Sequence, residues 1–113
     1  MLIIGLLFIV LAAVLGFYLL SFVIQNKNTP KGIAFLHGPF AAIGIIILII
    51  CAILYHPSLW VSIGIFIIAA LGGLTLIFRD LTGHSFPKWL AIGHGLVAII
   101  GFVILITQIY FKS

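Results

Sequence analysis

The stretch PKWLAIGHG at residues 87–95 repeats a pattern that the chain already carries as PKGIAFLHG at residues 30–38. Pro, Lys, Ala, His and Gly recur in the same order, and the offset is constant, since 87 minus 30 and 94 minus 37 both give 57. The match continues on both sides without a gap. The further matched pairs are Ala12 with Ala69, Ala13 with Ala70, Gly16 with Gly73, Leu19 with Leu76, Ala41 with Ala98, Gly44 with Gly101, and Leu48 with Leu105. Because the 113 residues are almost twice 57, the sequence predicts one unit written twice, as residues 1–56 and 58–113.

The composition places this unit in a membrane. Hydrophobic residues make up 65% of the chain and charged residues 5%, and the mean hydropathy is +1.53. A bilayer core requires runs of about twenty apolar residues. Such runs cover approximately Leu2–Ile24, Ile33–Leu54, Leu59–Phe78 and Trp89–Tyr110. We therefore predict an all-α, four-helix transmembrane bundle, with residues 1–113 forming a single integral membrane domain and no soluble domain.

The connections between these runs predict how the helices are arranged. They are short and rich in turn formers, and Pro30 and Pro87 each suit the first turn of the span that follows. Short connections favour an up-down-up-down bundle of antiparallel neighbours. Each copy is then a helical hairpin, so both copies have the same orientation and are related by an axis along the membrane normal. Spans two and four lie diagonally opposite each other in this arrangement.

The charges gather at span ends. Lys27 and Lys31 lie between the first two spans, Arg79, Asp80 and Lys88 lie between the last two, and Lys112 lies near the C-terminus. Basic loops tend to remain in the cytoplasm, so we expect loops 25–32 and 79–88 to be cytoplasmic, both termini to be outside, and the cytoplasmic membrane to be the location. The net charge of +4 forms no basic face, so the lipid bilayer and not nucleic acid is the expected partner.

His37 and His94 are the residues that suggest chemistry. Each lies six residues beyond its lysine, which places it about 9 Å along a helix and inside the edge of the hydrocarbon layer. An ionisable residue at that depth indicates a functional site. On diagonal helices the two rings would face each other at one depth if they point inward. They would then be structural hydrogen-bonding groups, ligands of one metal centre, or participants in proton or quinone chemistry.

Among metal centres, haem suits the sequence better than a bare ion. Zinc and copper sites take three or four protein ligands, but no span contains a carboxylate, and Cys51 is fourteen residues from His37. Haem iron needs only two axial ligands, which His37 and His94 would supply. The small residues expected to leave room for the macrocycle are Ala41, Gly44, Ala98 and Gly101. The cationic residues expected near the haem propionates are Lys31, Lys88 and Arg79.

In these paired His-Gly positions the chain resembles the membrane b-type cytochromes, which hold haem between His side chains on transmembrane helices lined by small residues. The resemblance covers the bundle and the two His-Gly positions. It implies a small haem-b-binding protein with bis-His ligation that transfers single electrons in or near a quinone or respiratory chain. Its partners would be a quinone or a membrane redox protein, and assembly as a homo-oligomer or within a larger complex is left open.

Two other functions remain as alternatives. One is a non-catalytic structural or accessory membrane subunit, in which the histidine pair only holds helices together. The other is a small parallel-repeat transporter, although proton-coupled transporters usually place Asp or Glu within the membrane and the only acid here is Asp80, at a span end. No nucleophile–base–acid set indicates a hydrolase, so whether the chain is an enzyme is not decided. His56 and His84 are predicted to be solvated loop residues.

Overall fold

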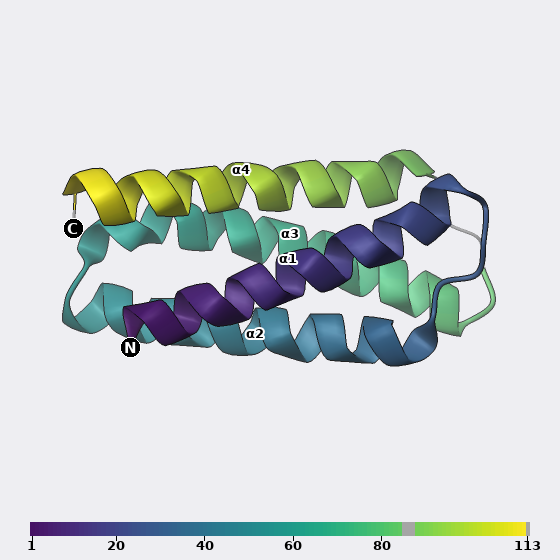
Figure 1. Cartoon of the computed structure of the whole chain (residues 1–113), viewed down its shortest axis with the longest axis horizontal. Coiled ribbons are helices and arrows are strands. Elements are labelled where there is room, and N and C mark those ends of the chain that lie inside the picture. The colour runs from purple at the N-terminus through teal and green to yellow at the C-terminus, as the bar shows by residue number, and fades with distance from the viewer. Residues whose placement is uncertain (85–87, 113) are drawn as a thin grey trace.

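The computed structural model describes residues 1–84 and 88–112, and this part of the chain is built from helices. The elements are α1 (Leu2–Ile24), α2 (Lys31–Leu54), the short 3-10 helix η1 (Pro57–Leu59), α3 (Trp60–Leu81) and α4 (Lys88–Lys112). The structure confirms the predicted all-α four-helix bundle (Figure 1). The α-helices have 22 to 25 residues, enough to cross a hydrocarbon layer of about 30 Å.

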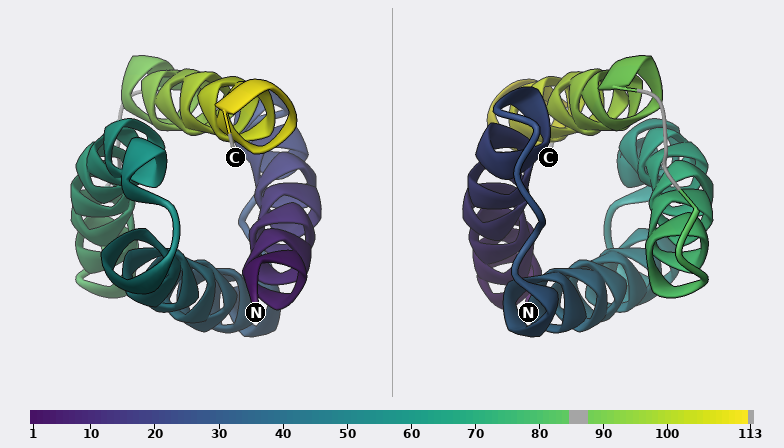
Figure 2. Two further views of the ribbon diagram at one scale, coloured as in Figure 1. Left: turned by 90° about the vertical axis from the view of Figure 1, so that its left-hand side faces the viewer. Right: turned by 90° about the vertical axis from the view of Figure 1, so that its right-hand side faces the viewer.

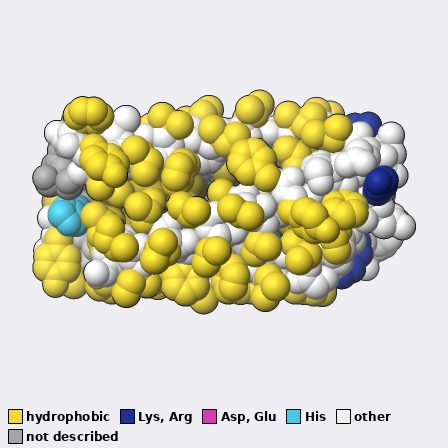
Figure 3. Space-filling view, viewed as in Figure 1, with side chains coloured by type: hydrophobic (Ala, Val, Ile, Leu, Met, Phe, Trp, Pro, Cys, Tyr) yellow, Lys and Arg dark blue, Asp and Glu magenta, His cyan; other side chains and the backbone are white. Residues whose placement is uncertain are grey.

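The surface of the bundle is that of an integral membrane protein. All four helices are long and apolar enough to span a bilayer. Large apolar side chains project outward along the middle of every helix, and in Figure 3 they cover most of the face in view. Lys and Arg side chains gather at one end of the same view. Such a surface would be unfavourable in water and matches the hydrocarbon core of a membrane.

The helices run alternately up and down around a square. In Figure 1, α1 and α3 run in one direction while α2 and α4 run in the other, so the two hairpins have the same orientation. The views along the bundle in Figure 2 show α2 opposite α4 and α1 opposite α3. Among the described residues, close backbone contacts join each helix to its two neighbours but not to the diagonal one. The α1–α2 and α3–α4 contacts are the more extensive, so each hairpin is a tightly packed unit.

The first helix of each hairpin also ends with the same backbone geometry. The helices α1 and α3 are each followed by a residue with positive φ, Asn26 at 58° and Gly83 at 75°, which are 57 positions apart. Glycine and asparagine are the residues that most readily adopt this conformation. One residue further on, Lys27 N–H donates to Phe22 O and His84 N–H donates to Arg79 O. Pro30 immediately precedes α2 as expected, whereas the predicted role of Pro87 lies outside the described residues.

The densest packing lies toward the end of the bundle that carries the chain termini. The repeat-related Leu48 and Leu105 are completely buried there. Gly44 and Gly101 let neighbouring helices approach: a Cβ at Gly44 would lie 2.8 Å from Ile9 Cδ1, and one at Gly101 would lie 3.1 Å from Phe66. This core closes one half of the bundle and leaves the half toward the charged end less tightly filled.

Replacement of Gly44 by leucine should destabilise the bundle. The new side chain would meet Ile9 of α1, including its backbone nitrogen at 3.3 Å from the first added carbon, so α1 and α2 must separate. Such overpacking costs about 1–3 kcal/mol of unfolding free energy. Unfolding in mild detergent, followed by circular dichroism, measures the change. Gly38→Leu is the matched control on the same helix, because a Cβ there meets nothing within 4 Å. Equal stability of the two variants would contradict this role of Gly44.

Candidate intramembrane histidine site

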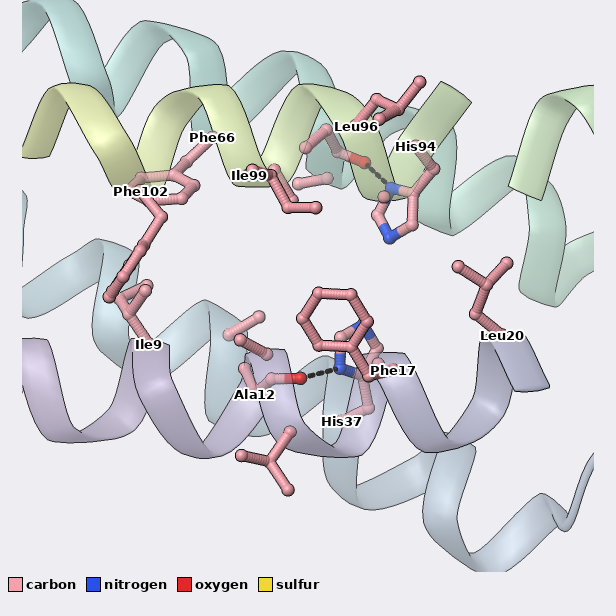
Figure 4. A pocket seen from close by; sticks show the side chains of 18 of the residues that line it. Ile9, Ala12, Phe17, Leu20, His37, Phe66, His94, Leu96, Ile99 and Phe102 are labelled. Atoms are coloured by element: carbon pink, nitrogen blue, oxygen red, sulfur yellow. Dashed lines mark hydrogen bonds between the residues drawn. The ribbon is translucent and has the colours of Figure 1, made fainter. Parts of the chain in front are cut away.

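The structure brings His37 and His94 together in the interior. His37 projects from α2 and His94 from α4, with ring centroids 6.2 Å apart and ring planes inclined by 88°. Figure 4 shows the two rings facing each other across the space between the hairpins. Both rings are partly buried. Two residues 57 positions apart in sequence therefore form one pair in space.

Each ring is held by a backbone carbonyl of its own hairpin. His37 Nδ1 lies 2.8 Å from Ala12 O, and His94 Nδ1 lies 2.7 Å from Ala69 O. A carbonyl oxygen can only accept a hydrogen bond, so Nδ1 is the donor in both rings. In the neutral ring the other nitrogen, Nε2, then carries a lone pair. The two bonds set the same tautomer in both histidines.

Gly16 and Gly73 make these bonds sterically feasible. In an α-helix the carbonyl of one residue points toward the residue four positions on, so Gly16 lies over Ala12 O and Gly73 lies over Ala69 O. A Cβ at Gly16 would be 3.0 Å from His37 Cε1, and one at Gly73 would be 3.0 Å from His94 Cε1. The repeat-related Ala12-x-x-x-Gly16 and Ala69-x-x-x-Gly73 patterns therefore leave room for the imidazole rings.

The remaining nitrogens point into the interior. In Figure 4 the Nε2 atoms of both rings are directed toward the space between the hairpins. Within residues 1–84 and 88–112, no hydrogen-bond partner is present for either Nε2. Two lone pairs cannot bond to each other. The pair therefore presents two nitrogen lone pairs, one from each hairpin, to the same interior space.

Two half-open pockets that share His37 and His94 as lining residues lie beside the pair, and we call them the two lobes of one cavity. One lobe, of about 360 Å³, lies mainly between α1 and α4, and the other, of about 670 Å³, lies mainly between α2 and α3. Both lobes are lined by His37 and His94, and they extend from the rings in different directions between the two hairpins. Apart from the rings, the lining is almost entirely apolar, with Thr29 and Asp80 at the charged end of the α2/α3 lobe. The volumes of the two lobes are typical of cofactor sites.

The small residues predicted to line a cofactor site divide into two groups. Ala41 lines both lobes and Ala98 lines the α1/α4 lobe. Gly44 and Gly101 lie instead at helix contacts, where Ile9 and Phe66 occupy the space above them. Their influence on the cavity is indirect, since they set the distance between the helices of each hairpin.

The cationic residues lie at the charged end, where two of them bridge the hairpins. Lys31 Nζ is 2.6 Å from Asp80 Oδ2, which joins α2 to α3. Its repeat equivalent Lys88 donates to the carbonyl oxygen of Ile24 at 3.2 Å, which joins α4 to α1. Arg79 precedes Asp80 and is half-buried at the end of α3. The sequence did not predict that the two lysines bridge opposite interfaces.

The other candidate ligands are remote from the pair. His56 lies beyond α2 with its ring centroid 6.3 Å from that of Tyr55, and His84 Nδ1 is 2.9 Å from Thr82 Oγ1 outside α3. Cys51 is buried in the core near the opposite end. Within residues 1–84 and 88–112, no group of three or more His, Cys, Asp or Glu side chains could hold a metal ion. A bare ion at the histidine pair would have two protein ligands.

Comparison of the chain with protein-family models, with curated proteins and with solved structures gives no significant match.

The tautomer of both histidines is directly measurable. In protein with ¹⁵N-labelled histidine, His37 and His94 should show a protonated Nδ1 and an unprotonated Nε2 in neutral detergent solution. Gly16→Leu should change the His37 signals and leave those of His94 in place, because the added side chain occupies the position of the His37 ring. Gly64→Leu is the control, since nothing lies within 4 Å of its Cβ position. A protonated Nε2 in both rings of the unmodified protein would contradict the hydrogen-bonding scheme.

Proposed function

We propose that this chain binds haem b with His37 and His94 as its two axial ligands and passes single electrons within a membrane. The observation that carries the proposal is the pair of inward-facing Nε2 atoms, each with a lone pair, in an apolar two-lobed cavity. Six-coordinate haem iron takes two such donors, one from each side.

The spacing of the rings supports this function. A metal held by two imidazole nitrogens, at the bond length of roughly 2 Å found for imidazole ligands, separates the ring centroids by roughly 6 Å. The centroids of His37 and His94 are 6.2 Å apart. The rings therefore need little movement to act as two ligands of one centre.

The shape of the cavity supports a flat ligand. The two lobes leave the histidine pair on different sides, and both lie between one hairpin and the other. A planar group between the rings would extend its two halves into the two lobes. Ala41 and Ala98 keep side-chain volume small beside the rings, and the buried Ala91 lines both lobes. These alanines follow the small-residue pattern expected of such a site.

The hydrogen bonds behind the rings suit metal ligation. Ligating histidines almost always donate the other ring N–H to a carbonyl or carboxylate, which fixes the ring and raises the basicity of the ligating nitrogen. Ala12 O and Ala69 O provide this second interaction for His37 and His94. The mostly apolar lining would limit the access of water to a bound iron. Bound haem b supplies a one-electron couple, whose potential depends on its ligands and surroundings.

A purely structural role would use only Nδ1 of each ring and would give Nε2 no function. The bonds from Nδ1 join α2 to α1 and α4 to α3, within hairpins that are already packed extensively. A purely structural histidine would not need its second nitrogen directed toward a repeat-related partner. The interior does not support the transporter alternative. The acidic residue Asp80 lies at the charged end, in an ion pair with Lys31.

Electron exchange would occur with a quinol or with a membrane redox protein, since the rings lie between helices that are long and apolar enough to span a membrane. We place the protein in the cytoplasmic membrane with its charged end in the cytoplasm, according to the charge bias of the loops.

Haem binding should be visible in the absorption spectrum. Protein purified in mild detergent after expression with added haem should show a Soret band and sharper visible bands on reduction. His37→Ala and His94→Ala should each shift the spectrum and release haem more readily, because five-coordinate iron remains at best. The double variant should bind no haem and still insert, since its surface stays apolar.

His56→Ala and His84→Ala are the matched controls and should retain the spectrum of the unmodified protein, because both residues lie away from the pair. A colourless unmodified protein would favour the structural alternative. Unchanged spectra in both His37→Ala and His94→Ala would exclude these residues as ligands.

The orientation makes a separate prediction. A reporter fused after Ser113 should be accessible from outside the cell, and a tag inserted in loop 25–32 should be accessible from the cytoplasm only. The reverse labelling pattern would show that the charge bias of the loops does not set the topology.

A further inference from the structure

The two interfaces between the hairpins carry equivalent lysines but different charges. Lys31 lies at the α2/α3 interface and is paired with the carboxylate of Asp80, which Thr29 also contacts at 3.2 Å. Lys88 lies at the α1/α4 interface and bonds to an uncharged carbonyl, that of Ile24. The asymmetry originates in the sequence, because the repeat equivalent of Asp80 is Val23.

This difference matters to an anionic group in the cavity. Asp80 itself lines the α2/α3 lobe, so a carboxylate in that lobe would face a like charge whose counter-ion, Lys31, is already engaged. The α1/α4 lobe contains no acidic lining residue within the described part of the chain, and its lining reaches Ile92, one helical turn from Lys88. Lys88 does not itself line this lobe, and no carboxylate of the described residues is paired with its ammonium group.

From this asymmetry we infer that Lys88 is the anchor for the carboxylates of the bound cofactor and that Asp80 excludes them from the other interface. The inference depends on the proposed haem function and adds to it a single orientation of the haem. Lys88 precedes His94 by six residues, about 9 Å along α4, so its side chain could extend to the propionates of a haem held by His94. Without Asp80, the pseudo-twofold relation of the hairpins would make two orientations nearly equivalent.

Restoring the symmetry tests the inference. The ferric protein reconstituted with a haem isomer that is symmetric about its α–γ meso axis should give one dominant set of haem methyl signals in its paramagnetic ¹H NMR spectrum, because only a change in the interface that the propionates occupy can then produce a second set. Asp80→Val places at this position the residue found at its repeat equivalent and releases Lys31 as a second anchor. This variant should show a second set of comparable intensity. The additional change Lys31→Gln, in the Asp80→Val background, should return the spectrum to one dominant set.

Binding of haemin and of its dimethyl ester to the apoprotein provides an independent readout, because the ester lacks the propionate charges. Lys88→Gln should weaken haemin binding about two- to fivefold, as expected for an exposed ion pair, and leave ester binding unchanged. Lys27→Gln removes the same charge from the loop after α1 and should have a smaller effect. Asp80→Asn checks that loss of the charge, rather than of the side-chain shape, admits the second orientation.

The outcomes separate this inference from the function on which it depends. Two equally populated orientations in the unmodified protein would overturn it, as would one unchanged set in Asp80→Val or equal weakening by Lys27→Gln and Lys88→Gln. In each of these cases the protein still binds haem, so the proposed function is not overturned. Failure of the unmodified protein to bind haemin would overturn the function itself.

Discussion

The hydrogen bond from a histidine Nδ1 to a helix carbonyl is the interaction on which the site depends. It occurs twice, from His37 to Ala12 and from His94 to Ala69, at 2.8 and 2.7 Å. Each bond fixes the tautomer of a ring and leaves a lone pair on Nε2. Each also requires a glycine one turn beyond the accepting carbonyl. A small-residue pattern in the first helix of each hairpin thus determines the chemistry available to the second.

Duplication converts this local arrangement into a site. One hairpin presents a single inward-facing nitrogen, which is a weak ligand set for any metal. Two hairpins of the same orientation place a second nitrogen opposite the first at the same depth, with the ring centroids 6.2 Å apart. The tight core around Leu48 and Leu105 holds the other half of the bundle closed, so the open volume is concentrated around the rings. Symmetry supplies the pair of inward-facing rings, and Asp80 breaks that symmetry at one interface.

Much of the fold was predictable because it follows from patterns that extend over many residues of the sequence. The apolar runs set the number of helices, and short connections set the antiparallel order and the diagonal relation of α2 and α4. The constant offset of 57 made His37 and His94 candidates for a pair. The carbonyls that seat the rings were not predictable, since every residue has one and only packing selects Ala12 and Ala69. Gly44 and Gly101 were expected beside the cofactor, but a glycine next to a cavity and one under a neighbouring helix give the same sequence pattern.

Electron paramagnetic resonance of the ferric protein tests the central claim most directly, because the signal of low-spin haem depends on the relative orientation of its two axial rings. The planes of His37 and His94 are inclined by 88°. Rings held near this angle by Ala12 O and Ala69 O should give a strongly anisotropic low-spin signal, and Gly16→Leu, which displaces the His37 ring, should abolish it. A high-spin signal from the unmodified protein, or no haem signal at all, would contradict ligation by this pair.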